Sequence, residues 1–197
     1  MHYRDYIPPA AKMLCSQLLD QHPVQLKVVK KRKTKHGDFR KLASGKTQIT
    51  VNENENPYRF LITLLHEMAH HIAFETYGFR IAPHGKEWKS TFREIAQPFL
   101  NPAIFPAPLL SCFTVHLKQP KASSDTDFLL GLALKAHDPV THKKAIFELA
   151  ADAKFKLDNG RVFQKGAQRR KRFLCKEVSS GKTYLFQPNA EVEQIQD

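Results

Sequence analysis

The segment LLHEMAHHIA at positions 64–73 places polar side chains inside an otherwise apolar run. Residues four apart lie on one face of a helix, so His66 and His70 would lie about 6 Å apart, with Glu67 beside them. Burying a carboxylate and two imidazoles among apolar side chains is costly unless a partner binds them. A metal ion is such a partner, and the segment therefore predicts a buried helix that carries a metal site.

This motif also indicates a particular chemistry. Two imidazoles at that spacing suit one Zn²⁺ ion, and a carboxylate next to them can take a proton from an attacking water and pass it to a leaving amine. We therefore predict His66 and His70 as zinc ligands and Glu67 as the catalytic base. The competing interpretation is a chance pairing on a surface helix, which the apolar flanks disfavour.

A catalytic zinc site of this kind needs a third protein ligand and one open position. His84 is the best candidate, because it follows His70 by 14 residues, precedes Gly85 and lies before another expected helix. We expect His71, about 100° further round the helix, to pack rather than to bind the metal. The other histidines weighed for this role are weaker candidates: His116, His137 and His142.

Two segments together resemble a known family. LHEMAH at 65–70 and APHGKEW at 82–88 are similar to the SprT-like metalloproteases, which include the eukaryotic Spartan proteases. The resemblance covers roughly residues 20–100. It implies one zinc ion per chain, with His66, His70 and His84 as ligands and Glu67 as the base. It also implies that Trp88 packs on the helix behind the third ligand.

The C-terminal region departs from that family. Many members carry a small cysteine zinc ribbon after the catalytic core, whereas the only cysteine after position 112 of this chain is Cys175. DNA binding through such a ribbon is therefore not implied. Cys15, Cys112 and Cys175 are scattered, and we expect them to be reduced.

The chain is strongly basic, with 31 Lys and Arg against 19 Asp and Glu and a formal net charge of +12. This imbalance indicates a polyanionic partner, most commonly nucleic acid. Cationic grooves with interleaved aromatics suit single-stranded DNA, although we expect Phe163 and Phe173 to lie in a core. The residues predicted to contact nucleic acid form two clusters: Lys30, Lys31, Arg32, Lys33 and Lys35, then Arg169, Arg170, Lys171 and Arg172.

Hydrophobic periodicity and turn signals predict an α+β fold. We expect a zincin-like core over residues 1–110, with a few strands on the motif helix, and a small β-rich module over 111–197. Helices are expected at 8–20, 58–77, 86–97 and 125–137. Strands are expected at 24–28, 47–51, 112–117, 153–157, 161–164, 171–175 and 183–186. Zinc peptidases commonly bind substrate along an edge strand, and the strand ending at 49–51 is our candidate.

The patterns predict a zinc-dependent endopeptidase that acts on DNA-associated proteins. The alternative is a nucleic-acid-binding module with a structural or latent zinc site, against which Glu67 argues, because a structural site has no use for a base. The N-terminus does not resemble a signal peptide, and no apolar run approaches the roughly 20 residues of a membrane helix. We therefore expect a cytoplasmic protein with no membrane partner.

Overall fold

The structure is a computed structural model that describes residues 2–32, 35–54 and 56–195. It divides into two compact units, Met1–Ser124 with Ala133–Asp138, and Asp125–Leu132 with Pro139–Asp197. These limits differ from the parts 1–110 and 111–197 expected from the sequence. The mixture of helices and sheets confirms the predicted α+β class. Among the described residues, none of the helices combines the length and hydropathy that a membrane span requires.

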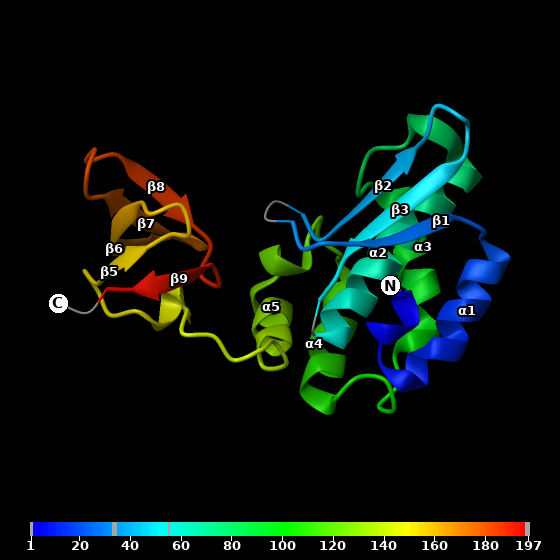
Figure 1. Cartoon of the computed structure of the whole chain (residues 1–197), viewed down its shortest axis with the longest axis horizontal. Helices are drawn as coiled ribbons and strands as arrows, with labels where there is room; N and C mark the ends of the chain where they lie inside the picture. The colour runs from blue at the N-terminus through cyan, green and yellow to red at the C-terminus, as the bar shows by residue number, and fades with distance from the viewer. Residues whose placement is uncertain (1, 33–34, 55, 196–197) are drawn as a thin grey trace. The chain divides into compact units, whose positions relative to one another are not determined.

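The first unit contains a three-stranded sheet in the order β1-β3-β2 (Figure 1). Its strands are β1 (Gln25–Val29), β2 (Gly37–Lys41) and β3 (Thr47–Asn52). β3 is parallel to β1 and antiparallel to β2. The expectation that residues 49–51 form an edge strand is therefore wrong, because β3 pairs on both sides. β2 was not predicted, because the many basic residues in and around it are typical of a connection between strands.

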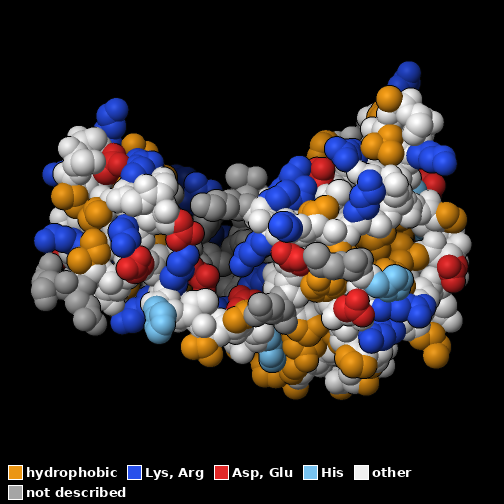
Figure 2. All heavy atoms as spheres, in the orientation of Figure 1, with side chains coloured by type: hydrophobic (Ala, Val, Ile, Leu, Met, Phe, Trp, Pro, Cys, Tyr) orange, Lys and Arg blue, Asp and Glu red, His pale blue; other side chains and the backbone are white. Residues whose placement is uncertain are grey.

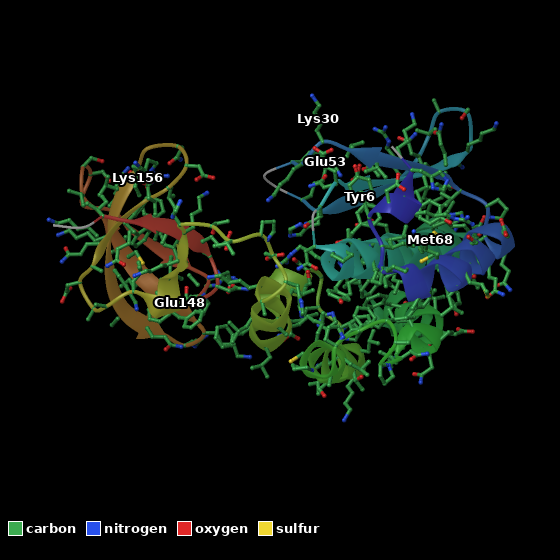
Figure 3. All side chains as sticks on the ribbon, turned by 60° about the horizontal axis from the view of Figure 1, so that its bottom comes forward. Tyr6, Lys30, Glu53, Met68, Glu148 and Lys156 are labelled. Atoms are coloured by element: carbon green, nitrogen blue, oxygen red, sulfur yellow. The ribbon has the colours of Figure 1, made fainter. Side chains whose placement is uncertain are left out.

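The motif helix α2 (Pro57–Tyr77) packs against β2 and β3. It begins where the Asn56 side chain accepts hydrogen bonds from the first backbone N–H groups, and Pro57 fits the first turn because it has no N–H to satisfy. It ends at Gly78, whose φ of 75° favours glycine. Figure 3 labels Met68, one of the fully buried side chains of this helix. The helix predicted at 58–77 is thus confirmed.

Further helices complete the first unit: α1 (Lys12–Gln21), α3 (Lys86–Ala96) and α4 (Ala107–Lys118). The strand predicted at 112–117 is wrong, because this segment belongs to α4. Leu109, Phe113 and Leu117 are all buried and recur every four residues, which is a helical period that the apolar run 112–117 hides. Pro106 stands immediately before the helix, where a proline is tolerated.

Residues 133–138 join the first unit through the N-terminus of α2. The helix predicted at 125–137 is α5 (Phe128–Lys135), preceded by one 3-10 turn. Asn56 Nδ2 donates to the Leu134 carbonyl at 2.8 Å and to Asp138 Oδ1 at 2.7 Å. Arg59 forms a two-pronged ion pair with Asp138, at 3.2 and 2.7 Å. The 3-10 turns of the chain are η1 (Tyr3–Asp5), η2 (Pro9–Ala11), η3 (Gly78–Arg80), η4 (Gln97–Phe99), η5 (Ser124–Thr126) and η6 (Ile146–Glu148).

The second unit is built on a six-stranded sheet in the order β4-β9-β5-β6-β7-β8. The strands are β4 (Lys144–Ala145), β5 (Lys154–Lys156), β6 (Val162–Arg169), β7 (Arg172–Glu177), β8 (Thr183–Phe186) and β9 (Glu191–Gln194). Its core gathers Ile146, Leu149, Phe155, Phe163, Cys175 and Val192. Four predicted strands are confirmed, as is the inward position of Phe163, whereas β4 and β9 were missed.

Candidate metal centre

Three histidine nitrogens converge at one point of the first unit. His66 and His70 come from adjacent turns of α2, and His84 comes from the loop before α3. Their Nε2 atoms form a nearly equilateral triangle, with sides of 3.2 Å (His66–His70), 3.1 Å (His66–His84) and 3.1 Å (His70–His84). Two nitrogens at about 2.05 Å from a tetrahedral Zn²⁺ lie about 3.3 Å apart, so the triangle fits that ion closely.

Hydrogen bonds alone cannot satisfy this triangle. A neutral imidazole nitrogen is either a donor or an acceptor, so at least one pair of the three must place donor against donor or lone pair against lone pair. Burial, reinforced by the neighbouring histidines, lowers the pKa of His66 to about 2 and that of His70 to about 4. Burial also lowers the pKa of His84. All three are therefore neutral near pH 7, which is the form that binds a metal.

The third histidine is delivered by an unusual backbone conformation. His84 has a φ of 57°, in the left-handed region that few residues other than glycine adopt. Gly85 follows, and its N–H donates to the Ala82 carbonyl at 2.9 Å. A Cβ added at Gly85 would lie 2.9 Å from that same oxygen, so the tight turn that presents His84 requires a glycine.

Trp88 packs against all three histidine rings. It is almost fully buried, and its ring centroid lies 4.6 Å from His66, 5.2 Å from His70 and 4.7 Å from His84. Trp88 Nε1 donates to the His66 carbonyl at 3.4 Å. The predicted packing position of Trp88 is confirmed, and the side chain restricts the orientation of the histidine set.

Glu67 lies on α2 between the first two histidines in sequence and is only 7% exposed. Burial raises the pKa of Glu67 to about 8, and the charge of Asp38 acts in the same direction. Arg32, Lys35 and a backbone hydrogen bond from Phe39 oppose this rise. A carboxyl group that ionises in this range suits reversible proton transfer at neutral pH.

The remaining histidines lie apart from the triangle. His71 is fully buried and its Nε2 lies 3.4 Å from Glu75 Oε2. His116 is on α4 rather than on a strand, where its ring packs against Phe92 and Phe113. Within the described ranges, His66, His70 and His84 are the only group of three such side chains placed to hold one metal ion.

The described residues of the first predicted nucleic-acid cluster, 30–32 and 35, differ in their exposure to solvent. Lys30, Lys31 and Lys35 are exposed, and Figure 3 shows Lys30 extending away from the sheet. Arg32 is partly buried, because its guanidinium donates to Asn52 Oδ1 at 2.8 Å and to Thr50 Oγ1 at 3.0 Å. Lys33 lies outside the described residues. Arg32 therefore serves the sheet as well as contributing charge.

The second cluster lies in the second unit. Arg169, Arg170, Lys171 and Arg172 are exposed at the turn that joins β6 to β7, where Arg170 has a φ of 53°. Phe173 is half-buried and packs on the core of the second unit. The turn therefore presents cations without an aromatic platform from that side chain.

The outer face of the first sheet is also cationic. Arg40 donates to Gln48 Oε1 from Nε at 3.0 Å, and Lys27 is paired with Thr50 on the same face. Figure 2 shows Lys and Arg side chains gathered over β1, β2 and β3. The polar residues of β3 are thus buried beneath arginine side chains, and the positive charge is displayed outward.

Two residues near Glu67 were missed by the sequence analysis. Gly37 and Phe39 lie on β2, and both approach Glu67 across the α2 interface. A glycine just before an alternating segment is the only signal that the sequence carried, and the many neighbouring lysines obscured it.

A histidine pair four residues apart on a helix and a third histidine from the next loop form a group that could hold one metal ion, and the buried carboxyl group of Glu67 lies on the same helix. Residues 12–106 match the model of the SprT-like family. Over this segment the chain is similar to the SprT-like family, and the match confirms the resemblance drawn from residues 65–70 and 82–88.

A curated relative agrees with this assignment. The chain is 37% identical over 62 residues to Protein SprT of Vibrio parahaemolyticus serotype O3:K6 (strain RIMD 2210633). That match covers 27% of this chain and 37% of the relative, so just over a third of the relative is represented. No solved structure matches the chain significantly.

Proposed function

We propose that this chain is a zinc-dependent endopeptidase with a zincin-like catalytic core. The observation that carries this proposal is the triangle of neutral Nε2 atoms with the Glu67 carboxyl on the same helix. A purely structural site has no need of an acid–base group, whereas hydrolysis requires one. The similarity of residues 12–106 to the SprT-like family supports the same conclusion.

In this mechanism His66, His70 and His84 hold one Zn²⁺ ion, which when bound supplies Lewis acidity toward water and a carbonyl oxygen. Glu67 accepts the proton of the attacking water on its carboxylate and delivers it to the departing amine. Its raised pKa favours temporary retention of that proton. Trp88 packs the three imidazoles together, so the ligands need little reorganisation.

The strand that offers an edge for an extended peptide is β2. Hydrogen bonds from Asn52 N to His36 O and from Leu42 N to Lys46 O, both 2.8 Å, set the alternation of the β2–β3 ladder. By that alternation, the backbone groups of Gly37, Phe39 and Lys41 face away from β3. We therefore assign substrate pairing to the outer edge of β2, apart from the Phe39 N–H that donates to Glu67, instead of to residues 49–51.

We further propose DNA, preferably single-stranded, as a partner, and DNA-associated proteins as substrates. The support is the net charge of +12, the cationic outer face of the first sheet and the exposed lysines Lys30, Lys31 and Lys35. The exposed turn at 169–172 is a second phosphate-binding candidate. A cytoplasmic site of action is part of the same proposal.

The decisive experiment compares zinc-loaded wild type with Glu67→Gln for cleavage of a DNA-binding protein and for self-cleavage, with and without single-stranded DNA. The glutamine variant keeps the size of the side chain but removes the base, so it tests the chemistry at equal zinc content. Cleavage that needs both Glu67 and DNA supports the whole proposal. Cleavage without DNA keeps the peptidase and removes the DNA coupling.

Absence of cleavage by fully zinc-loaded wild type would contradict the peptidase proposal and favour the alternative of a binding module with a structural or latent zinc site. A filter-binding measurement with single-stranded DNA then separates the two. Salt-dependent binding that is unaffected by Glu67→Gln is the result expected for such a module.

A further inference from the structure

One face of β2 lies along α2, so that successive residues on this face of the strand contact successive turns of the helix. The built Cβ position of Gly37 is next to Thr63 and Glu67. Phe39, two residues on, places its ring 6.5 Å from that of His70 and 5.7 Å from that of Phe74. The strand therefore runs beside the part of α2 that carries Thr63, Glu67, His70 and Phe74.

The contact at Gly37 leaves no room for a side chain. A Cβ added there would lie 2.6 Å from Glu67 Oε1, 2.7 Å from Glu67 Cγ and 2.8 Å from Thr63 Cγ2. The φ of Gly37 is not in the left-handed region, so backbone conformation does not explain the glycine. The close approach of the strand to the carboxyl group does.

Phe39 supplies a hydrogen bond to the same carboxyl group. Its backbone N–H faces away from β3 by the alternation of the ladder, and it donates to Glu67. The carboxyl is therefore held by van der Waals contact at Gly37 and by a hydrogen bond at Phe39. These two contacts, both made by β2, define the orientation of the Glu67 carboxyl group.

The start of β2 is in turn fastened to β3. Asn52 is almost fully buried, and its side chain accepts from Arg32 Nε at 2.8 Å and donates to the Lys35 carbonyl at 2.7 Å. The backbone N–H of Asn52 donates to the His36 carbonyl, one residue before Gly37. Arg32 and Asn52 thus fix the point at which the strand begins.

We propose that the backbone of β2 at Gly37 and Phe39, fastened by Asn52 and Arg32, is the element that positions Glu67 for proton transfer. The catalytic consequence rests on the proposed peptidase function, whereas the contact itself does not. Gly37, Asn52 and Arg32 are positioning residues, since the effect proposed for their side-chain positions is exerted through Glu67. Their effect is on the orientation of the base and not on the metal ligands.

The first test measures amide hydrogen exchange by NMR and needs no activity. In the wild-type protein the Phe39 amide is expected to be protected, although it lies on an outer edge. In Glu67→Ala its exchange is expected to be at least tenfold faster, while the Arg40 amide, which faces β3, changes little. Unchanged exchange at Phe39 in Glu67→Ala would overturn the proposal.

The second test is kinetic and uses zinc-loaded full-length chain with a fluorophore-labelled unfolded protein as substrate. Gly37→Ala is expected to lower kcat at least tenfold, with KM and zinc content within twofold of wild type. Gly166→Ala is the matched control, because its added Cβ would meet the Leu174 carbonyl at 2.6 Å within the second unit. Equal losses in both variants would show a general folding defect and overturn the proposal.

Should Gly37→Ala fail to fold, Arg32→Lys takes its place. Lysine keeps the positive charge but cannot bridge Asn52 and Thr50, so a severalfold loss of kcat at constant KM indicates positioning. Wild-type kinetics in Arg32→Lys would overturn the role of the fastening. Inactive wild type with Glu67-dependent protection at Phe39 would refute the peptidase function and support the contact, so the two failures are distinguishable.

Discussion

Glu67 in the first unit and Glu177 in the second are both 7% exposed, yet their surroundings act on them in opposite directions. Arg161 Nε donates to Glu177 Oε1 at 2.6 Å, Ser180 bonds the other oxygen, and together they lower the pKa of Glu177. Within the part of the chain that the structure describes, Glu67 forms no ion pair of this kind, and burial raises its pKa to about 8. A paired carboxylate holds structure together, whereas one kept near neutrality is available to move a proton.

The largest effect on activity is expected when each of the two glutamates is replaced by glutamine in a separate variant. Glu67→Gln should lower peptide cleavage by roughly a hundredfold to ten-thousandfold, the usual contribution of a general base. Glu177→Gln should leave cleavage unchanged and lower the thermal midpoint of the second unit. Rates of fluorescent substrate cleavage at matched zinc content measure this. Comparable loss of activity in both variants would remove the distinction between them.

The next largest effect concerns the histidines of α2 and its following loop. His84→Ala removes one of three ligands and should weaken zinc binding by more than about a hundredfold, since even outer-shell changes cost 10- to 100-fold. His71→Ala, on the same helix but outside the triangle, should keep zinc affinity and lose stability. Competition with a coloured zinc chelator measures the zinc affinity of both variants. Full zinc affinity in His84→Ala would refute the ligand assignment.

A core substitution sharpens the contrast between the two units. Phe155 is fully buried and its ring lies 5.7 Å from Phe163 and 5.5 Å from Phe186. Phe155→Ala should lower the unfolding free energy of the second unit by about 3–5 kcal/mol. Denaturant unfolding measures this, with the exposed Val178→Ala as control. Loss of zinc from the first unit in Phe155→Ala would show that the units do not fold separately.

The smallest effect is a dependence on pH. The pKa of Glu177 is lower in the folded protein than its value of about 4.3 in an unfolded chain. Its contribution to stability is therefore complete above that unfolded value and is lost as pH falls through the folded pKa. Thermal midpoints of the second unit should fall on acidification, less steeply in Glu177→Gln than in wild type. Identical slopes in the two proteins would contradict this account.

Several elements were predictable because their signals are local. The helix at 58–77 combined an N-terminal proline, a C-terminal glycine and continuous apolar residues, and α2 has nearly those limits. The turns around 158–160 and 179–181 separated strands that the structure contains. The segment 112–117 misled because a short apolar run suits either strand or helix, and only the buried positions further back along α4 separate the two.

The sequence by itself identified the residues of the candidate metal centre, since the spacing of His66, Glu67 and His70 acts within about one turn of a helix, and the local context of His84 indicated the third histidine. Only the tertiary structure decided how Glu67 is held. Gly37 and Phe39 lie about thirty residues before it, and Arg32, whose charge suggested a phosphate contact, is engaged with Asn52 and Thr50. The physical reason is that strand order and the packing of a strand on a helix depend on distant partners, which no local period records.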